Sequence, residues 1–381
     1  MDLDMTRPSA FLSGVAAAWE GMKRHREPLS RLGRLWTTQQ WYLMYAETNT
    51  GTADTSTFKP LNPPPNAFWA DPFVVVRESR CVVFFEQFHY RFWGRTRGGK
   101  GTIAAMERFP DGTWGEPALI LERDYHLSYP FVFQWQDRFY LLPETAENRT
   151  IELYEEVEFP WKWRFCRTIM HGVSALDTTL HQADGRWWMF TCVQTDGVAN
   201  RDLHLFSSPD PVGGDWEPHP SNPIVSDRRC ARPAGGIFFD GHHWIRPSQD
   251  CSRDYGRAVE FRRIVRLDQN AYAEEPAGRF GPEEFVGAAG VHTWNSARGL
   301  QMADARRRIA RWRLIWGKIG TRVFVSRGAI CTVYPWLSDL AQGRCSAGSI
   351  ARYTGMPHVR VEEVRPPVKM LQDLDGLRDL I

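Results

Sequence analysis

The stretch from Phe68 to Val76 reads FWADPFVVV, which places an acidic residue and a proline inside an apolar run. Later segments repeat this phrase. They read LSYPFVFQWQDRFYLLPE (127–144), with Ser128 in the place of the aspartate, LDTTLHQADGRWWMFT (176–191), ARPAGGIFFDGHHWIRPSQD (231–250) and, in a more degenerate copy, GVHTWN (290–295). The shared pattern is a small or acidic polar residue followed by an apolar run, and its recurrence indicates a repeated structural unit.

The spacing of the copies predicts the architecture. Short runs rich in β-branched and aromatic residues alternate with Gly, Pro, Asn and Asp turns from Trp41 onward, which favours strands. Copies about 45 to 60 residues apart match a four-stranded propeller blade. We therefore predict an all-β fold, a five-bladed β-propeller over residues 37–330. Asp71 would begin an inner strand at the axis, where Pro72 is tolerated as the first strand residue.

Short helical extensions are expected on both sides of the propeller. Residues 1–36 carry apolar side chains at helical spacing, and 331–381 end in leucines at every third position from Leu371 to Leu380. Between 301 and 330 the chain has eight Lys or Arg against one Asp. This basic stretch, residues 306–327, and the terminal helices are candidate contacts for a membrane surface or a partner protein.

Composition excludes several function classes. A net charge of +2 argues against a nucleic-acid partner. Seven cysteines without a CxxC pair argue against a disulfide framework and a zinc module. We find no nucleotide-binding or dinucleotide-binding fingerprint and expect no cofactor and no metal. The N-terminus is a poor secretory signal and no segment reaches membrane-spanning length, so we expect a cytoplasmic protein, with association at a membrane surface left open.

The ordered motifs resemble a known family. FWADPF, HLSYPFVF, YLLPE, DTTL, RPSQDC and GVHTWN, spread over about residues 37 to 300, are similar to the N-terminal domain of glucosamine inositolphosphorylceramide transferases. That domain in turn resembles the five-bladed propellers of arabinanases, xylosidases and invertases. The resemblance implies a five-bladed fold with a carbohydrate at an axial pocket. In the transferases the nucleotide-sugar chemistry belongs to a different domain, so the resemblance leaves catalysis open.

The resemblance to the hydrolases also implies roles for three carboxylates. Glycosidases place two carboxyl groups astride the scissile bond, one as acid and the other as base or nucleophile. Asp71 matches the base or nucleophile, Asp177 matches the aspartate that orients the substrate, and Glu144 is the candidate acid, with Glu86 at the equivalent place one blade earlier. The alternative is structural, because an Asp at a strand start often caps backbone N–H groups.

Further candidates would bind the ligand. In the fourth copy, where the hydrolases would supply the acid, the chain has arginines, which favour an anionic sugar; an Arg–Asp pair between blades is the alternative. The predicted substrate-binding set is Trp69, Glu86, His126, Arg232, Arg246, Asp250 and His292.

Three functions stay open at this point. The first is a glycoside hydrolase or transglycosylase-like enzyme. The second is a non-catalytic module that binds a glycan or sugar nucleotide in a polysaccharide or glycolipid biosynthesis system. The third, a transferase in its own right, would need a nucleotide-sugar site that the sequence does not reveal.

Overall fold

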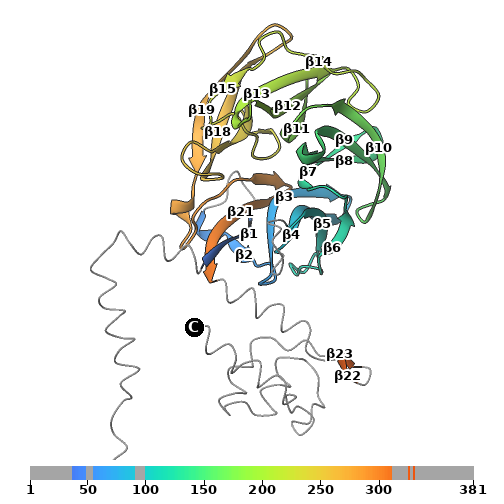
Figure 1. The fold of residues 1–381 in the computed structure, drawn as a ribbon, viewed down its shortest axis with the longest axis vertical. Coiled ribbons are helices and arrows are strands. Elements are labelled where there is room, and N and C mark those ends of the chain that lie inside the picture. Colours follow the sequence, from blue (N-terminus) through green and yellow to red (C-terminus); the bar gives the residue numbers. More distant parts are fainter. Residues whose placement is uncertain (1–36, 49–54, 91–98, 311–324, 327–328, 331–381) are drawn as a thin grey trace, which may run out of the picture. The chain divides into compact units, whose positions relative to one another are not determined.

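The computed structural model describes residues 37–48, 55–90 and 99–310, together with the backbone of 325–326 and 329–330. Five antiparallel sheets are arranged in a ring around a central axis, which confirms the predicted all-β, five-bladed propeller (Figure 1). In the described part of the chain we find no α-helix. The predicted terminal helices lie in residues outside it.

Each blade is formed by strands that are consecutive in sequence, except for the last. Blade 1 contains β3 (Ala67–Arg77), β4 (Arg80–His89), β5 (Gly101–Arg108) and β6 (Ala118–Leu121). Blade 2 contains β7 (Ser128–Trp135), β8 (Arg138–Thr145), β9 (Thr150–Glu158) and β10 (Lys162–His171). Blade 3 contains β11 (Ala175–Ala183), β12 (Arg186–Thr195), β13 (Val198–Ser208), β14 (Glu217–Pro218) and β15 (Val225–Ser226). Blade 4 contains β16 (Phe238–Phe239), β17 (Trp244–Asp250), β18 (Ala258–Leu267) and β19 (Tyr272–Phe280). Short 3-10 helices lie at Thr55–Thr57, Ala146–Asn148 and Pro282–Glu284.

Blade 5 joins the two ends of the propeller. It is built from β20 (Trp294–Ala297), β21 (Leu300–Ala310), β1 (Thr37–Glu47) and β2 (Lys59–Leu61). β1 pairs with β21 along its whole length, from Thr37 opposite Ala310 to Glu47 opposite Leu300. The ring is therefore closed by hydrogen bonds between the first and last propeller strands.

The last propeller strand that the structure describes ends at Ala310, and the predicted boundary at residue 330 stays a prediction. The chain divides into two compact units, Met1–Ile315 and Trp316–Ile381. A hairpin of β22 (Val325–Ser326) and β23 (Ala329–Ile330) belongs to the second unit. Among the residues that the structure describes, no helix is long and apolar enough to cross a membrane.

The repeated sequence motif forms a β-bulge inside the strand rather than at the start of the strand. β3 begins at Ala67, and Asp71-Pro72 lies at a register shift between Ala70 and Phe73. Such a bulge leaves residues unpaired, which is why Pro72 is tolerated in mid-strand. β7 and β11 carry the same shift.

The bulges also correct the sequence alignment of the copies. Left-handed residues mark the same position in three strands: Asp71 with φ 53°, Tyr129 with φ 44° and Asp177 with φ 51°. Tyr129, not Ser128, therefore stands where the first copy has its aspartate. Asp and Asn tolerate this region better than other non-glycine residues. The aspartates at these positions therefore fit the backbone conformation of the bulge, whatever chemical role their carboxyl groups have.

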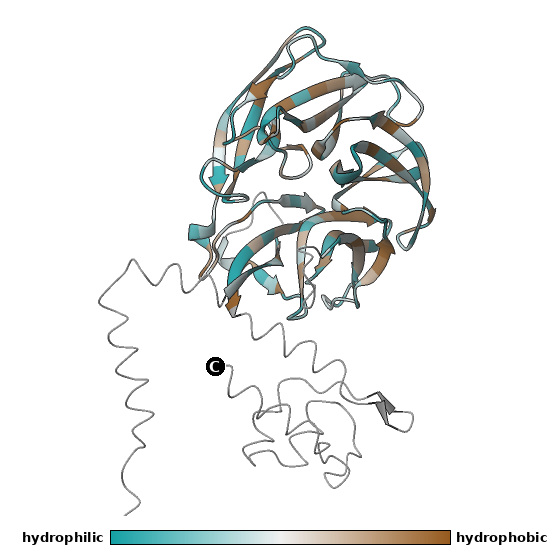
Figure 2. Ribbon diagram, in the orientation of Figure 1, coloured by the Kyte–Doolittle hydropathy of each residue, from teal (hydrophilic) through white to brown (hydrophobic). Residues whose placement is uncertain are grey.

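Apolar side chains fill the spaces between neighbouring blades. Hydrophobic and hydrophilic stretches are interspersed over all the blades, as Figure 2 shows. Phe73, Phe84, Phe131 and Phe133 belong to one cluster that joins blades 1 and 2. Gly235 permits a close approach near the axis: its φ is 138°, and a Cβ there would lie 2.0 Å from the carbonyl oxygen of Trp294.

Candidate active site

Near the axis, carboxylate side chains form hydrogen bonds between neighbouring blades. The three left-handed residues each donate their backbone N–H to a carboxylate of the preceding blade: Asp71 to Asp304 (2.9 Å), Tyr129 to Asp71 (3.2 Å) and Asp177 to Glu144 (3.1 Å). A bulge frees this N–H from the strand ladder, and a buried N–H needs an acceptor. The acidic residues at the axis are therefore explained in part by blade assembly.

Asp71 is almost inaccessible, with 3% of its surface exposed. Its Oδ1 accepts a hydrogen bond from Thr293 Oγ1 (2.7 Å), and its Oδ2 accepts the one from Tyr129. Burial raises the pKa of Asp71 to about 6, although the nearby His292 lowers it. The carboxyl group thus changes its charge close to neutral pH.

His292 lies between two aspartates. Its Nε2 is 3.4 Å from Asp71 Oδ1, and its Nδ1 is 2.7 Å from Asp304 Oδ2. Trp41 stacks on the imidazole with ring centroids 4.0 Å apart. Burial opposes the charged ring, but Asp304 and Asp71 outweigh it and raise the pKa of His292. The two aspartates therefore favour the protonated form of His292.

Arg232 links Asp177 and Glu144. Its Nε and Nη2 bind the two oxygens of Asp177 at 2.6 and 3.0 Å, and Nη2 also donates to Glu144 Oε2 at 3.2 Å. Gln249 donates a further hydrogen bond to Asp177. Asp177 and Arg232 are 1% and 8% exposed. This arrangement is the inter-blade Arg–Asp pair that the sequence left open as the alternative to an anion site.

Glu86 has a different environment. It is 5% exposed, and its Oε1 accepts no hydrogen bond from the described residues, although His126 Nε2 lies 3.3 Å away. Burial, followed by the charges of Asp71, Glu144 and Asp177, raises the pKa of Glu86 well above its usual range. The imidazole of His126 is one-third exposed, accepts the N–H of Gly101 at 3.0 Å, and has a pKa lowered by burial. Burial and the neighbouring carboxylates therefore favour the protonated form of Glu86.

The structure brings most predicted site residues together and places three elsewhere. Asp71, Glu86, Glu144, Asp177, Arg232 and His292 form one electrostatic cluster, with His126 at its edge. Trp69 packs in an apolar cluster with Leu43 and Phe85. Arg246 is fully buried against Glu274 (2.8 Å), and Asp250 caps the N–H of Ser252 (3.0 Å).

Two residues of the site were missed by the sequence reasoning. Asp304 is fully buried and accepts the N–H groups of His292 and Thr293, both at 3.0 Å. Tyr255 lies under the guanidinium of Arg232, 5.1 Å from its ring centre. Asp304, the single acidic residue in a basic stretch, was the available signal. Nothing in the local sequence marked Tyr255.

Asp71, His292 and Asp304 could also be considered as metal ligands, because one donor atom from each lies within 4.8 Å of the others. However, the four carboxylate oxygens already accept hydrogen bonds from protein groups, and protonation of His292, which the two aspartates favour, removes a lone pair. These interactions account for the cluster without an ion, and the absence of a metal stays a prediction.

Comparisons with known proteins agree with the motifs. Residues 55–315 match the family model described as glucosamine inositolphosphorylceramide transferase 1, N-terminal. The protein of that name from Oryza sativa subsp. japonica is 33% identical over 238 residues, which cover 61% of this chain and 31% of the rice protein. The one from Arabidopsis thaliana is 31% identical over 242 residues and covers 30% of its length. The chain thus spans about a third of these relatives.

A solved structure, the family 117 glycoside hydrolase Zg3597 of Zobellia galactanivorans, aligns with a TM-score of 0.47 and 11% identity over 80% of this chain and 98% of that one. A likeness of this size carries no functional argument. The family assignment rests on the match over residues 55–315, and the five blades observed here agree with it. The chain belongs to the family defined by the N-terminal domain of glucosamine inositolphosphorylceramide transferase 1.

Proposed function

We propose that this propeller acts on a glycan at its axial mouth and cleaves or transfers a glycosidic bond. The observation that carries the proposal is Glu86, a buried carboxyl with a strongly raised pKa and an oxygen that accepts no hydrogen bond from the described residues. Beside it lies Asp71, with a pKa of about 6. Two carboxyl groups whose pKa values are raised to different extents supply the acid and the base of glycosidic chemistry.

The roles follow from the contacts. Glu86 donates its proton to the glycosidic oxygen as the bond between that oxygen and the anomeric carbon breaks. Ionised Asp71 takes the proton of the attacking hydroxyl, from water in hydrolysis or from an acceptor in transfer. The sequence favoured Glu144 as the acid, but Glu144 accepts hydrogen bonds from Asp177 N and Arg232. We therefore assign Glu144 and Asp177 to positioning and Glu86 to proton donation.

A binding module without turnover is the second candidate, and Arg232 favours it. This arginine occupies both oxygens of Asp177 and reaches Glu144, at the place where the hydrolases that the motifs resemble would carry an acid. The relatives' name joins glucosamine with inositolphosphorylceramide, so a module that presents such a headgroup to a partner enzyme fits this candidate. A cytoplasmic location and a membrane or protein contact through 306–327 belong to both versions of the proposal.

The deciding experiment compares turnover and binding in matched variants. The purified chain is incubated with glycolipids and oligosaccharides that end in glucosamine, hexose or pentose, and released or transferred sugars are measured by mass spectrometry. Glu86→Gln should reduce turnover by at least about a hundredfold, the usual contribution of a general acid, with the melting temperature unchanged or raised. Glu116→Gln, an exposed site with the same chemical change, should leave turnover intact.

Each outcome separates the candidates. Turnover that survives in Glu86→Gln contradicts the assignment of the acid. Saturable binding without any product supports the binding module. A chain that neither binds nor converts any of these sugars contradicts both versions.

A further inference from the structure

The arginines that the sequence suggested as an anion site are already neutralised. Arg232 pairs with Asp177 and Glu144, and Arg246 pairs with Glu274. A buried cation whose hydrogen bonds go to buried carboxylates has little attraction left for a ligand anion. If the chain recognises an anionic sugar, the positive charge must come from another part of the mouth.

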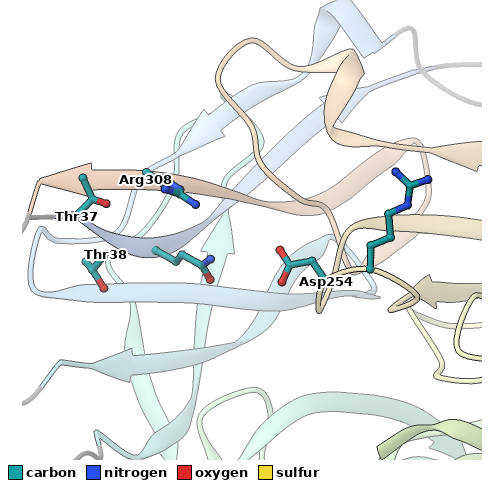
Figure 3. Close-up of a pocket in the computed structure, with 6 residues that line it drawn as sticks. Thr37, Thr38, Asp254 and Arg308 are labelled. Atoms are coloured by element: carbon teal, nitrogen blue, oxygen red, sulfur yellow. The ribbon is translucent and has the colours of Figure 1, made fainter. Parts of the chain in front are cut away.

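A polar cavity of about 660 Å³ opens where β1 begins and β21 ends. Its lining combines the start of β1, the end of β21 and the loop after β17, and comprises Thr37, Thr38, Gln39, Arg253, Asp254 and Arg308. Figure 3 shows Thr37, Thr38 and Arg308 on the β1 and β21 side, with Asp254 across from them on the loop. The side chains that line the cavity are hydroxyl, amide and charged groups.

The cavity has an excess of positive charge. Arg253 and Arg308 are exposed and have no ion pair with any residue of the described segments. Among the described lining residues, the one acidic side chain is that of Asp254, which pairs with the buried Arg306. Two uncompensated guanidinium groups beside hydroxyl donors form a suitable environment for a phosphate group, which accepts paired N–H donors from arginine.

Two chain segments that line the cavity also carry aromatic residues that contact the axial site. Tyr255, the residue after Asp254, lies 5.1 Å under Arg232 and 5.4 Å from the ring of His292. Trp41, two residues after Gln39, stacks on the same histidine at 4.0 Å. The cavity lining and the axial site are thus linked by two aromatic residues that both contact His292.

We infer that this cavity binds the phosphate group of a phosphorylated glycan, with Arg253 and Arg308 as its ligands. The inference rests on the proposed function, because it assigns the charged part of the molecule whose sugar occupies the axial mouth. It adds a substrate class: a sugar whose phosphate, as monoester or diester, lies one residue beyond the carboxylates. The phosphate can belong to a soluble sugar phosphate or to a lipid headgroup.

The test uses matched pairs of probes with the full chain. Binding of glucosamine and glucosamine 1-phosphate, and of inositol and inositol 1-phosphate, is measured by calorimetry for the wild type, for R253A/R308A and for R266A. We expect the phosphorylated member of at least one pair to bind about tenfold more tightly. R253A/R308A should abolish this preference and leave the affinity for the neutral member unchanged. R266A, an exposed arginine on β18, should keep it.

A vesicle arm distinguishes the two sources of phosphate. Cosedimentation with phosphatidylinositol vesicles, but not with phosphatidylcholine vesicles, that is lost in R253A/R308A identifies a lipid headgroup; preference for the soluble probes alone identifies a sugar phosphate. Equal binding of both members of each pair, without lipid selectivity, overturns the inference but leaves the proposed function standing. Preference that persists in R253A/R308A also overturns it. Absence of binding to every probe overturns both.

Discussion

Arg232→Gln tests how strongly the buried ion pair at the axis stabilises the propeller. The substitution removes two contacts to Asp177, at 2.6 and 3.0 Å, and one to Glu144 at 3.2 Å. Asp177 is 1% exposed, so its charge would be left buried without its cation. Removing one partner of a buried pair costs about 3–5 kcal/mol. For a domain of this size that corresponds to a fall in melting temperature of roughly 6–20 °C.

The measurement is chemical or thermal unfolding followed by tryptophan fluorescence, with two comparison variants. Arg266→Gln breaks an exposed pair with Asp268, whose side chains are 59% and 43% exposed, and should cost at most about 1 kcal/mol. Adding Asp177→Asn to Arg232→Gln removes the stranded charge and should recover part of the loss. A loss in Arg232→Gln no larger than that in Arg266→Gln would refute the reasoning, as would an additive double variant.

Two further predictions concern the axis. The plot of kcat/KM against pH should rise through about pH 6, because Asp71 acts as a base only when ionised and its pKa is about 6. The plot should fall again at a pH above the usual carboxyl pKa range, where Glu86 loses its proton. A profile that is flat between about pH 5 and 7 would count against the assigned base. Gly235→Ala should lower the stability by about 3 kcal/mol or more, because the new Cβ would lie 2.0 Å from the Trp294 carbonyl oxygen. Gly241→Ala is the control, since Gly241 also has a positive φ (102°) but open space around it. Equal melting temperatures for the two variants would show that the clash with the Trp294 carbonyl oxygen does not determine the loss of stability.

The sequence predicted the blades because each copy repeats both an apolar pattern and an acidic start. It also predicted that Asp71, Asp177 and Glu144 meet, since inner strands of a propeller converge on one axis. It misaligned Ser128 with Asp71 because it matched the polar residues, whereas the shared Pro-Phe pairs at 72–73 and 130–131 place Tyr129 opposite Asp71. The backbone conformation of Tyr129, with φ 44°, is visible only in three dimensions.

The sequence also did not predict which side chains form ion pairs or hydrogen bonds with one another. Arg232 and Arg246 occupy similar places in the fourth copy, yet one arginine reaches the axis and the other pairs with Glu274 on β19. Asp304 lies on β21, and it contributes to the site because β21 and β20 share a blade. Contacts between segments this far apart depend on how the ring closes, which local pattern does not encode.

The ring of hydrogen bonds explains why Glu86 is the informative residue. Asp304, Asp71 and Glu144 each accept a backbone N–H from the next blade, and Asp177 binds Arg232, so these four carboxylates contribute to folding. Glu86 differs from them: its buried Oε1 accepts no hydrogen bond from the described residues, and His126 Nε2 lies 3.3 Å from it. A buried polar atom without a partner costs stability, and sites that break the rules of stable packing are where function is expected. Loss of turnover in Glu86→Gln without loss of stability would therefore distinguish chemistry from assembly at this axis, which no substitution of the other four carboxylates can do.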